Sequence, residues 1–549
     1  MLFLKSVAAG VIDGRNVGHD RAVHGCVGAV RLLSGYYLVV LTSCSFVEHI
    51  LGCAVFKATD FGIIRCSAPG LFHALSRQHR RDEARYLHLL RASLVENSKH
   101  LYFAYGHDIS RNCQSQYLLC RPWCSIRTNF NQNPSRDKAK CKSVNLLSPD
   151  GMLASHADGG SECNKSMTVT AHQLQNDSWY LADKRFCWNR CAGEMLDDIT
   201  LPTNRSRRSI RALLLPLICG SFGCFRDAQG DTSLSLVART SVSRFGIRHH
   251  CRGSNTEGEV ANFVETEQIV CVQQRYLSSF VMVRGSVPLK WSQPLRDFSW
   301  NQKISFNSSG NISNTRRHFA KLLSHYGRVK VVDLLSSRGE EGMLKQAFIR
   351  SVSLLPSSNH PSAQVQYFHF DLHEEMANSN TAALERLASW TKAESSDLGQ
   401  FMFVSGREES GCQMNLQNGV FRVNCKDCLD RTNLVQRIIA SSVLQQQLRA
   451  VEIINSDFSK RCKKAHRVLW ADHGDRISSQ YAGTLALRRD LTRTGNRTLG
   501  GLLQDAKTAL NRYFRAKFLD GSAQDSLDLW TTGYLPGIED APLRSARCE

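Results

Sequence analysis

The sequence predicts an α/β protein of two lobes, in which a β-rich N-terminal lobe precedes an α/β lobe that carries the chemistry. Three observations support this prediction. Short apolar segments rich in β-branched residues fill the first part of the chain, strand-like and helix-like segments alternate later, and 549 residues exceed what one hydrophobic core normally serves. A hydrophobic content of 42%, with 8% aromatic residues, excludes a disordered or fibrous chain.

The N-terminal lobe is predicted over residues 1–210. Its first strands are three short apolar segments, at 27–33, 36–41 and 54–56. Gly35 and Gly52 separate these segments, which is typical of an antiparallel meander. A helix-like segment that contains Trp188 and Leu196 is expected near the end of the lobe.

Residues of about 111–177 interrupt this lobe with a change of composition. Ser, Asn, Gln, Asp and Lys dominate and no apolar period is kept, so we interpret the segment as a loop-like insertion. It contains Cys113, Cys120, Cys124, Cys141 and Cys163. These cysteines lack the two C-x2-C pairs of common zinc modules, and we expect no metal there.

The second lobe is predicted over residues 211–534, with a short tail at 535–549. Strands are expected at 260–272, 280–283, 329–335 and 365–370, and helices at 316–325 and 343–352. This alternation predicts a largely parallel or mixed sheet covered by helices.

The chain is strongly basic, with 69 Lys and Arg against 49 Asp and Glu and a net charge of +20. Such a charge points to an anionic partner, which is a nucleic acid, a membrane surface or a phosphorylated substrate. No nucleic-acid motif is present, so we expect no nucleic-acid partner. The 20 cysteines are scattered, and neither a secretory signal nor a transmembrane segment is evident, which favours a cytoplasmic protein.

The chemistry is concentrated in one loop between a predicted strand and a predicted helix. Residues 419–424 alternate as a strand does, and apolar residues from Leu434 to Leu448 recur with helical spacing. Between them lies a C-x5-R sequence that begins at Cys425 and ends at Arg431. The N–H groups of such a loop, together with the helix N-terminus, form an anion cradle. This setting lowers the pKa of Cys425, the predicted nucleophile, and lets Arg431 clamp two phosphoryl oxygens.

Each of the residues near Cys425 and Arg431 has two possible roles. Thr432 either donates a hydrogen bond to the thiolate as it leaves or caps the helix. Asp427, with Asp430 second, is the candidate acid that protonates the leaving oxygen, although either carboxylate could instead orient Arg431 or cap the helix.

Lys426 is expected either to contact a phosphate or to remain solvated. Asn424 and Asn433 are further candidates for substrate contact. Cys428 is expected to be a packed structural thiol or to form a protective disulfide under oxidation.

The string Arg-Val-Asn-Cys-Lys-Asp-Cys-Leu-Asp-Arg-Thr-Asn, residues 422–433, resembles almost letter for letter the signature of the Sac-type phosphoinositide phosphatases. Further segments resemble other blocks of the same domain, at 37–41, 57–61, 186–189, 260–269, 280–293, 470–472, 480–484, 490–495 and 520–529. The subgroup most similar in block order is the endoplasmic reticulum and Golgi enzyme, whose preferred lipid is phosphatidylinositol 4-phosphate.

This resemblance implies a Sac-type two-lobe fold and a phosphatase that removes a monophosphate from a phosphoinositide through a cysteinyl-phosphate intermediate. It implies phosphoinositide lipids and an anionic membrane as partners, and a peripheral place at the cytosolic face of endoplasmic reticulum or Golgi membranes. Because the loop amides and Arg431 already neutralise the phosphoryl charge and no convincing carboxylate–His cluster is evident, we expect no metal and no cofactor. A catalytically silent phosphoinositide-binding scaffold is the alternative, and the intact Cys425, Arg431 and Asp427 speak against it.

The sequence also departs from that subgroup. Two transmembrane helices normally follow the domain, whereas only residues 535–549 follow the last block here, so we expect the anchor to be absent. Leu485 stands where the family usually has Gly, which affects local backbone geometry. The insertion at 111–177 differs from the shorter connection of the family.

Residues 485–519 contain eight Lys and Arg against two acidic residues. An anionic membrane would attract such a segment, although it could equally be a solvated helix face. The candidate membrane-contact residues are Arg488, Arg489, Arg493 and Arg497. Protein partners and the oligomeric state are not predicted.

Overall fold

The computed structural model describes residues 23–67, 69–119, 144–145, 168–169, 178–198, 213–273, 275–293, 303–306, 311–355, 364–377, 381–405, 413–451, 453, 456–495, 498–533 and 535. Its main sheet contains the strands β1 Gly25–Leu32, β2 Gly35–Ile50, β3 Cys53–Arg65, β4 Leu101–Ala104, β7 Ile218–Arg226, β8 Thr232–Thr240, β9 Val264–Val272, β10 Tyr276–Arg284, β13 Arg328–Asp333, β14 Val365–His369, β15 Phe401–Val404, β16 Gln413–Asn415 and β17 Gly419–Asn424. Two-stranded sheets pair β5 Val144–Asn145 with β6 Thr168–Val169, and β11 Trp291–Ser292 with β12 Ser305–Phe306.

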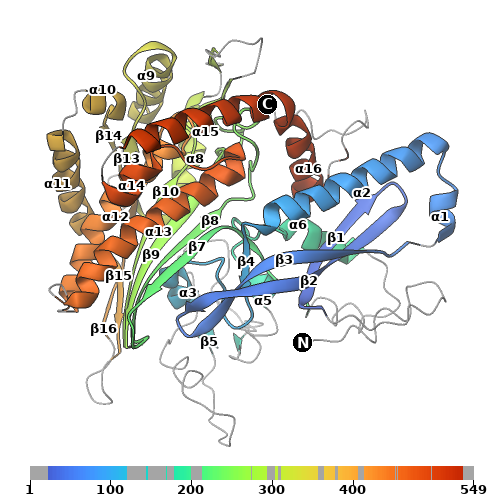
Figure 1. Ribbon diagram of the computed structural model, residues 1–549, viewed down its shortest axis with the longest axis horizontal. Helices are drawn as coiled ribbons and strands as arrows, with labels where there is room; N and C mark the ends of the chain where they lie inside the picture. The colour runs from blue at the N-terminus through green and yellow to red at the C-terminus, as the bar shows by residue number, and fades with distance from the viewer. Residues whose placement is uncertain are drawn as a thin grey trace, which may run out of the picture.

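The helices are α1 Pro69–His73, α2 Arg77–Ser98, α3 Cys113–Leu119, α5 Ser178–Leu181, α6 Arg190–Glu194, the 3-10 helix η3 Met195–Asp198, α8 Asn311–Tyr326, α9 Gly339–Ser353, α10 Leu372–Ala377, α11 Thr381–Leu398, α12 Asp430–Ala450, α13 Asp457–Ala482, α14 Arg489–Thr494, α15 Leu499–Phe518 and α16 Asp520–Thr532. A mixed sheet covered by helices confirms the predicted α/β class (Figure 1).

The predicted antiparallel meander is confirmed at the start of the sheet. Strands β1, β2 and β3 pair antiparallel in chain order. Gly35 opens β2 at the first turn with φ +114°, a conformation that L side chains rarely adopt. Strand β4 then pairs with both β3 and β7, so the main sheet continues from the meander into the second half of the chain.

The segment interpreted as an insertion begins with structure rather than with a loop. Residues Cys113–Leu119 form α3, and the Cys113 N–H donates to the Glu267 carboxylate at 2.8 Å. Tyr117 packs against Phe401 and Phe403. The predicted start of the loop at residue 111 is therefore wrong, because Cys113–Leu119 is a helix that the Cys113 N–H and the Tyr117 ring hold against the sheet. Residues 120–143, 146–167 and 170–177 of the predicted insertion lie outside the described residues.

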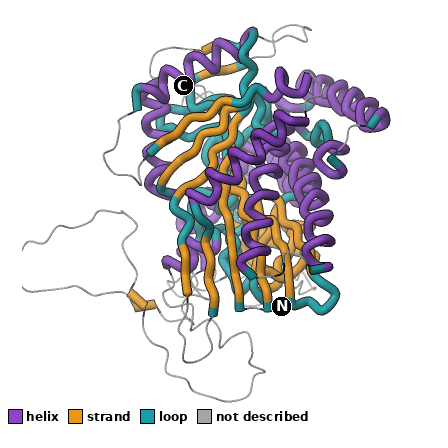
Figure 2. Tube along the Cα trace, turned by 90° about the vertical axis from the view of Figure 1, so that its left-hand side faces the viewer, coloured by secondary structure: helices purple, strands orange, loops and turns teal. Residues whose placement is uncertain are grey.

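The functional half of the sheet is a three-layer arrangement. Strands β10, β17, β13 and β14 lie parallel to one another, in that order. Phe280 and Met282 of β10 pack with apolar side chains of α12 and α13, whereas Val281 and Val283 pack with those of α8 and α9. Successive side chains of a strand point to opposite faces, so both faces of these strands are buried. Figure 2 shows strands lying between helices on either side.

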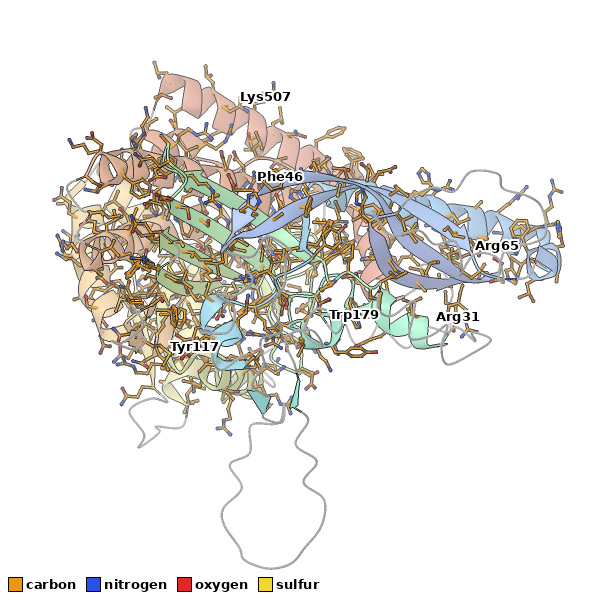
Figure 3. The ribbon with its side chains drawn as sticks, turned by 90° about the horizontal axis from the view of Figure 1, so that it is seen from below. Arg31, Phe46, Arg65, Tyr117, Trp179 and Lys507 are labelled. Carbon is orange, nitrogen blue, oxygen red and sulfur yellow. The ribbon has the colours of Figure 1, made fainter. Side chains whose placement is uncertain are left out.

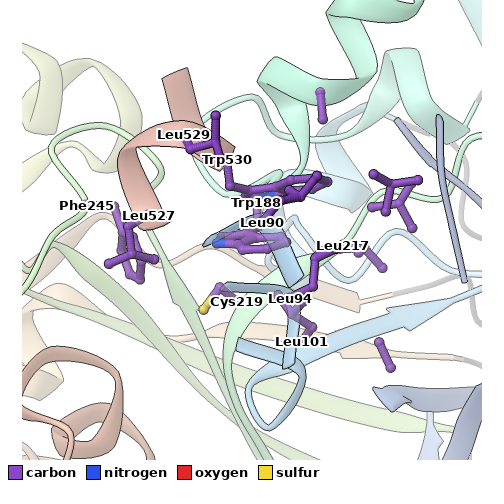
Figure 4. Close-up of a cluster of buried hydrophobic side chains, with 14 of the residues drawn as sticks. Leu90, Leu94, Leu101, Trp188, Leu217, Cys219, Phe245, Leu527, Leu529 and Trp530 are labelled. Carbon is purple, nitrogen blue, oxygen red and sulfur yellow. The ribbon is translucent and has the colours of Figure 1, made fainter. Parts of the chain in front are cut away.

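The last helix returns to the N-terminal half. Trp530 of α16 stacks on Trp188 with ring centroids 5.0 Å apart, and both side chains are almost fully buried (Figure 4). The same apolar cluster includes Leu90 and Leu94 of α2 and Leu217 beside β7. The predicted lobe boundary at residue 210 lies outside the described residues, as does the predicted tail except for Leu535.

Candidate active site

The C-x5-R loop lies at the carboxyl edge of the parallel strands. Strand β17 ends at Asn424, α12 begins at Asp430, and β17 is flanked by β10 and β13. Ligands of α/β sheets bind at this edge, outside the carboxyl ends of the strands. The N-cap of α12 is Leu429, whose side chain has no oxygen to accept from the N–H groups of the first turn. The start of the helix is therefore suited to an anion.

Cys425 is buried at the base of this loop, and two donors point at its sulfur. The backbone N–H of Cys428 lies 3.1 Å from Sγ, and the Thr432 hydroxyl lies 3.3 Å from it. Burial alone would raise the pKa of Cys425, but these hydrogen bonds and the charge of Arg431 hold it at about 6. The sulfur is consequently a thiolate at neutral pH, and Thr432 lies within the first turn of α12 and not at its N-cap.

Arg431 is held in place by Glu341 of α9. Its two terminal nitrogens, Nη1 and Nη2, donate to the two Glu341 carboxylate oxygens at 2.8 and 2.9 Å, and Nη1 also donates to the Leu334 carbonyl at 3.0 Å. Burial opposes ionisation of Glu341, yet the paired guanidinium lowers its pKa. Three of the five N–H donors of an arginine are thus engaged, which leaves two for a substrate oxygen pair.

Asp427 is paired with two arginines from a distant segment. Arg252 approaches its carboxylate to 2.6 Å and Arg248 to 3.6 Å. Burial would raise the pKa of Asp427, but these two charges hold it well below its usual value. In the free protein Asp427 is therefore a carboxylate, and it has no proton to give to a leaving oxygen.

Asp430, the second candidate acid, is occupied by other contacts. Its carboxylate accepts two hydrogen bonds from Arg512 of α15, at 2.8 and 3.2 Å, and one from the Leu487 N–H at 2.6 Å. Asp430 thus ties α15 and the segment before α14 to the catalytic loop, which is a positioning role.

Asn424 and Asn433 lie below the loop and do not line the cavity described below. The Asn424 amide donates to Asp333 at 2.6 Å and accepts from Arg422 at 2.7 Å. The Asn433 amide donates to the Trp470 carbonyl at 2.9 Å and accepts from Arg284 at 3.2 Å. Because both side-chain amides are buried and partnered, their geometry fits support of the loop instead of substrate contact.

Cys428 has the environment of a structural thiol. Its Sγ donates to the Gly285 carbonyl at 2.8 Å, and burial raises its pKa well above that of a free thiol. Its backbone is left-handed, with φ +52°, which is uncommon for a residue other than glycine. Strained backbone of this kind concentrates at functional loops.

A cavity of about 410 Å³ opens above Cys425. It is lined by Arg248, His249, Arg252, Gln293, Glu341, Cys425, Lys426, Asp427, Asp430, Arg431, Leu487, Arg488, Ala509, Arg512, Tyr513 and Ala516. Six of these side chains are Lys or Arg and three are carboxylates, so the lining carries excess positive charge. The predicted residue Lys426 is among them. Such a site suits a compact anion with polar groups around it.

Sequence reasoning missed the cavity residues that are remote from the loop. Arg248, Arg252 and Glu341 follow no recognised spacing, and only the fold brings them to Asp427 and Arg431. Burial and the charges of Arg248 and Arg252 lower the pKa of the cavity residue His249 to about 3, so its ring is neutral at physiological pH. No sequence signal could have identified these contacts.

The arginines expected at a membrane have other positions. Arg488 lines the cavity, Arg489 pairs with Asp475 at 2.7 Å, and Arg493 pairs with Asp472. Arg497 lies outside the described residues. Of the three arginines that the structure describes, two are therefore paired with a carboxylate. Among the described residues, no helix is long and apolar enough to cross a bilayer.

Leu485 replaces the expected glycine without backbone strain, since it is not among the residues with positive φ. The left-handed position in this segment is Gly483, which ends α13 with φ +63°. The Leu485 carbonyl accepts from Arg512 at 3.1 Å. A side chain at position 485 is therefore compatible with the local geometry.

Comparisons with known proteins extend over most of the chain. Residues 24–377 match the SacI homology domain. Phosphoinositide phosphatase SAC7 of Arabidopsis thaliana is 32% identical over 528 residues, which are 94% of this chain and 76% of that protein. Phosphatidylinositol-3-phosphatase SAC1-B of Danio rerio is 31% identical over 538 residues, 96% of this chain and 78% of that protein. Phosphatidylinositol-3-phosphatase SAC1 of Drosophila melanogaster is 31% identical over 544 residues, with the same two coverages. The domain match ends before Cys425, whereas these long alignments include the loop.

Proposed function

The chain belongs to the SacI homology domain family, and from this membership we propose that it is a phosphoinositide phosphatase that acts through a cysteinyl-phosphate intermediate. Family membership agrees with the resemblance found in the sequence. The observation that carries the mechanism is the Cys425 sulfur, which is held as a thiolate by two hydrogen bonds beside Arg431 in a cationic cavity.

In the first step the Cys425 thiolate attacks the phosphorus of the substrate. A bond forms between Sγ and phosphorus, and the bond between phosphorus and the inositol oxygen breaks as that oxygen takes a proton. The two remaining donors of Arg431 bind the phosphoryl oxygens, with Glu341 fixing the orientation of the fork. Water then attacks phosphorus, so that an oxygen–phosphorus bond forms, the sulfur–phosphorus bond breaks and the protons of the water remain with the released phosphate. Thr432 donates to the departing sulfur, which leaves as a thiolate.

For the proton donor we propose Asp427 in its substrate-bound state. A phosphoryl dianion in the cavity competes for Arg248 and Arg252, which now hold the Asp427 carboxylate ionised. Nearby negative charge raises the pKa of a carboxylic acid, so substrate binding favours uptake of a proton by Asp427. The proton is then passed to the leaving inositol oxygen.

Phosphatidylinositol 4-phosphate is the lipid that we propose as substrate, because the block order of the sequence resembles the endoplasmic reticulum and Golgi subgroup. The names of two relatives, which describe a phosphatidylinositol-3-phosphatase, make phosphatidylinositol 3-phosphate the main rival. The same resemblance supports a peripheral place at the cytosolic face of those membranes.

Phosphate release from each phosphoinositide isomer, presented in vesicles, tests this function. The Cys425→Ser variant is the control, since a serine hydroxyl is nearly isosteric but a poor nucleophile. We expect release by the natural chain, greatest with phosphatidylinositol 4-phosphate, and none by the variant. Equal release by the variant would exclude the covalent mechanism, and lipid binding without any release would identify a silent binding module.

A further inference from the structure

Helix α15 turns an apolar face away from the protein. Seven of the seventeen large apolar side chains that are exposed among the described residues lie between residues 499 and 519. Leu499, Leu503, Leu510, Phe514 and Phe518 are spaced at intervals of four and seven residues, which places them on one side of a helix. Leu499 is 82% exposed and Leu503 is 75% exposed, so this face has no cover in the described part of the protein.

The opposite side of the same helix is docked firmly on the catalytic lobe. Thr508, Arg512 and Ala516 are its buried residues. Besides Asp430, Arg512 donates to the hydroxyls of Thr484 and Ser478, at 2.9 and 2.7 Å. The orientation of the apolar face relative to the cavity is therefore fixed by buried hydrogen bonds.

The inner side of α15 is also a wall of the cavity. Ala509, Arg512, Tyr513 and Ala516 all line it. A partner that binds the outer side of α15 would thus lie beside the cavity above Cys425. Figure 1 shows α15 crossing the upper part of the molecule, above α13.

Basic residues outnumber acidic residues on α15, which favours contact with an anionic surface. Besides the buried Arg512, the helix contains three basic residues, Lys507, Arg515 and Lys517, and one acidic residue, Asp505. The Asp505 carboxylate accepts from the Arg488 N–H at 2.9 Å, which directs it toward the protein. Lys507 lies on α15 in Figure 3, and it is exposed. Basic side chains beside an apolar helix face are typical of helices that lie in the headgroup region of a bilayer.

We propose that the outer face of α15, formed by Leu499, Leu503, Leu510, Phe514 and Phe518, inserts into the headgroup–acyl boundary of an anionic lipid bilayer and seats the mouth of the cavity against it. This proposal rests on the proposed function, because a lipid substrate explains why a cavity wall should meet a membrane. It replaces the basic arginines of residues 488–497 as the main membrane contact.

Binding to vesicles without any phosphoinositide tests the proposal apart from catalysis. The vesicles contain phosphatidylcholine and phosphatidylserine, and binding is measured by co-sedimentation. The test variant carries Leu503→Gln, Leu510→Gln and Phe514→Gln. The matched control carries Leu71→Gln, Val95→Gln and Leu354→Gln, which remove three apolar side chains that are 55%, 63% and 55% exposed elsewhere.

We expect the test variant to lose vesicle affinity by about tenfold or more, because each change removes apolar area from the inserted face. The control variant should bind as the natural chain does. At 1 M salt, where charge attraction is screened, the natural chain should still bind better than the test variant. Hydrolysis of a short-chain, water-soluble phosphoinositide should be equal in all three proteins.

Equal vesicle binding by the test variant and the natural chain would overturn the proposal. A second result would also overturn it: the natural chain forms dimers in solution and does not bind vesicles, whereas the test variant is monomeric. The apolar face would then join two copies of the chain. If the natural chain fails to hydrolyse the short-chain lipid but the test variant alone loses vesicle binding, the proposed function fails and the membrane face stands.

Discussion

At the scale of single residues, the loop keeps the sulfur of Cys425 ionised although that residue is buried. Burial opposes a charge on Cys425, and the Cys428 N–H, the Thr432 hydroxyl and Arg431 outweigh that opposition. The C-x5-R pattern of the loop could be recognised in the sequence because its residues are contiguous. The partners Glu341, Arg248 and Arg252 were not, because their contacts depend on the tertiary fold.

The thiol titration gives the first prediction. With a pKa of about 6, Cys425 is increasingly thiolate as the pH rises through that value, so inactivation by iodoacetate should show a midpoint near pH 6. Thr432→Val removes one donor to the sulfur and should move this midpoint to higher pH. A midpoint near that of an ordinary thiol in the natural chain would show that the loop does not stabilise the thiolate.

A leaving-group comparison gives the second prediction. Asp427→Asn should lower turnover of a phosphoinositide by about 10²- to 10⁴-fold, the usual contribution of a general acid. An activated aryl phosphate, whose leaving group needs no proton, should lose far less. Both rates are measured at the same pH by phosphate release.

Asp430→Asn is the matched control for this comparison, because Asp430 is bound to Arg512 and the Leu487 N–H. It should affect the two substrates equally. If Asp427→Asn also lowers both rates by one factor, Asp427 acts only by holding Arg248 and Arg252.

At the scale of elements, the sequence predicted those whose apolar pattern is regular. The β1–β3 meander, α8, β13, α9 and β14 all occur where strand or helix spacing was evident. Helix α3 was taken as loop because its sequence keeps no apolar period. It is held instead by single contacts, the Cys113 N–H to Glu267 of β9 and the Gln114 side chain to the Gln417 carbonyl. Helix α15 was predicted either as a basic membrane-contact segment or as a solvated helix face. The sequence could not show that its apolar side faces outward or that Arg512 is buried.

The ion pair between α15 and the catalytic loop gives the third prediction. Arg512→Met leaves the Asp430 carboxylate without its charged partner and should destabilise the protein by about 3–5 kcal/mol. Adding Asp430→Asn removes the unpaired charge, so the double variant should be more stable than the sum of the two single changes implies, by about 0.5–3 kcal/mol. Urea unfolding of the four proteins measures this coupling. Additive effects would mean that the pair contributes no specific coupling.

At the scale of the whole molecule, one core connects distant parts of the chain. The cluster around Trp188 and Trp530 joins α2, β7 and α16, and the main sheet passes from the meander into the catalytic half. The sequence suggested two lobes from changes of composition along the chain. Composition carries no information about strands that pair across such a change, so the continuity of the sheet was not foreseen.

The Trp188–Trp530 contact gives the fourth prediction. Trp530→Ala removes a large buried ring from the shared cluster and should cost about 3–5 kcal/mol. Because that cluster contains residues from both halves, the loss should lower the midpoint of one common unfolding transition, followed by circular dichroism and by tryptophan fluorescence. Separate shifts of two transitions would show that the halves unfold independently.

The pairing of β4 with β7 also has a consequence for any attempt to divide the chain. A fragment that begins near residue 213 would keep β7 and β8 paired but would leave the β4 side of β7 bare. The first residues of β7, including Ile218 and Cys219, are fully buried in the intact protein. An apolar strand edge without a neighbour is a template for aggregation. Strand β4 therefore covers an edge of β7 that would otherwise favour aggregation of the catalytic half.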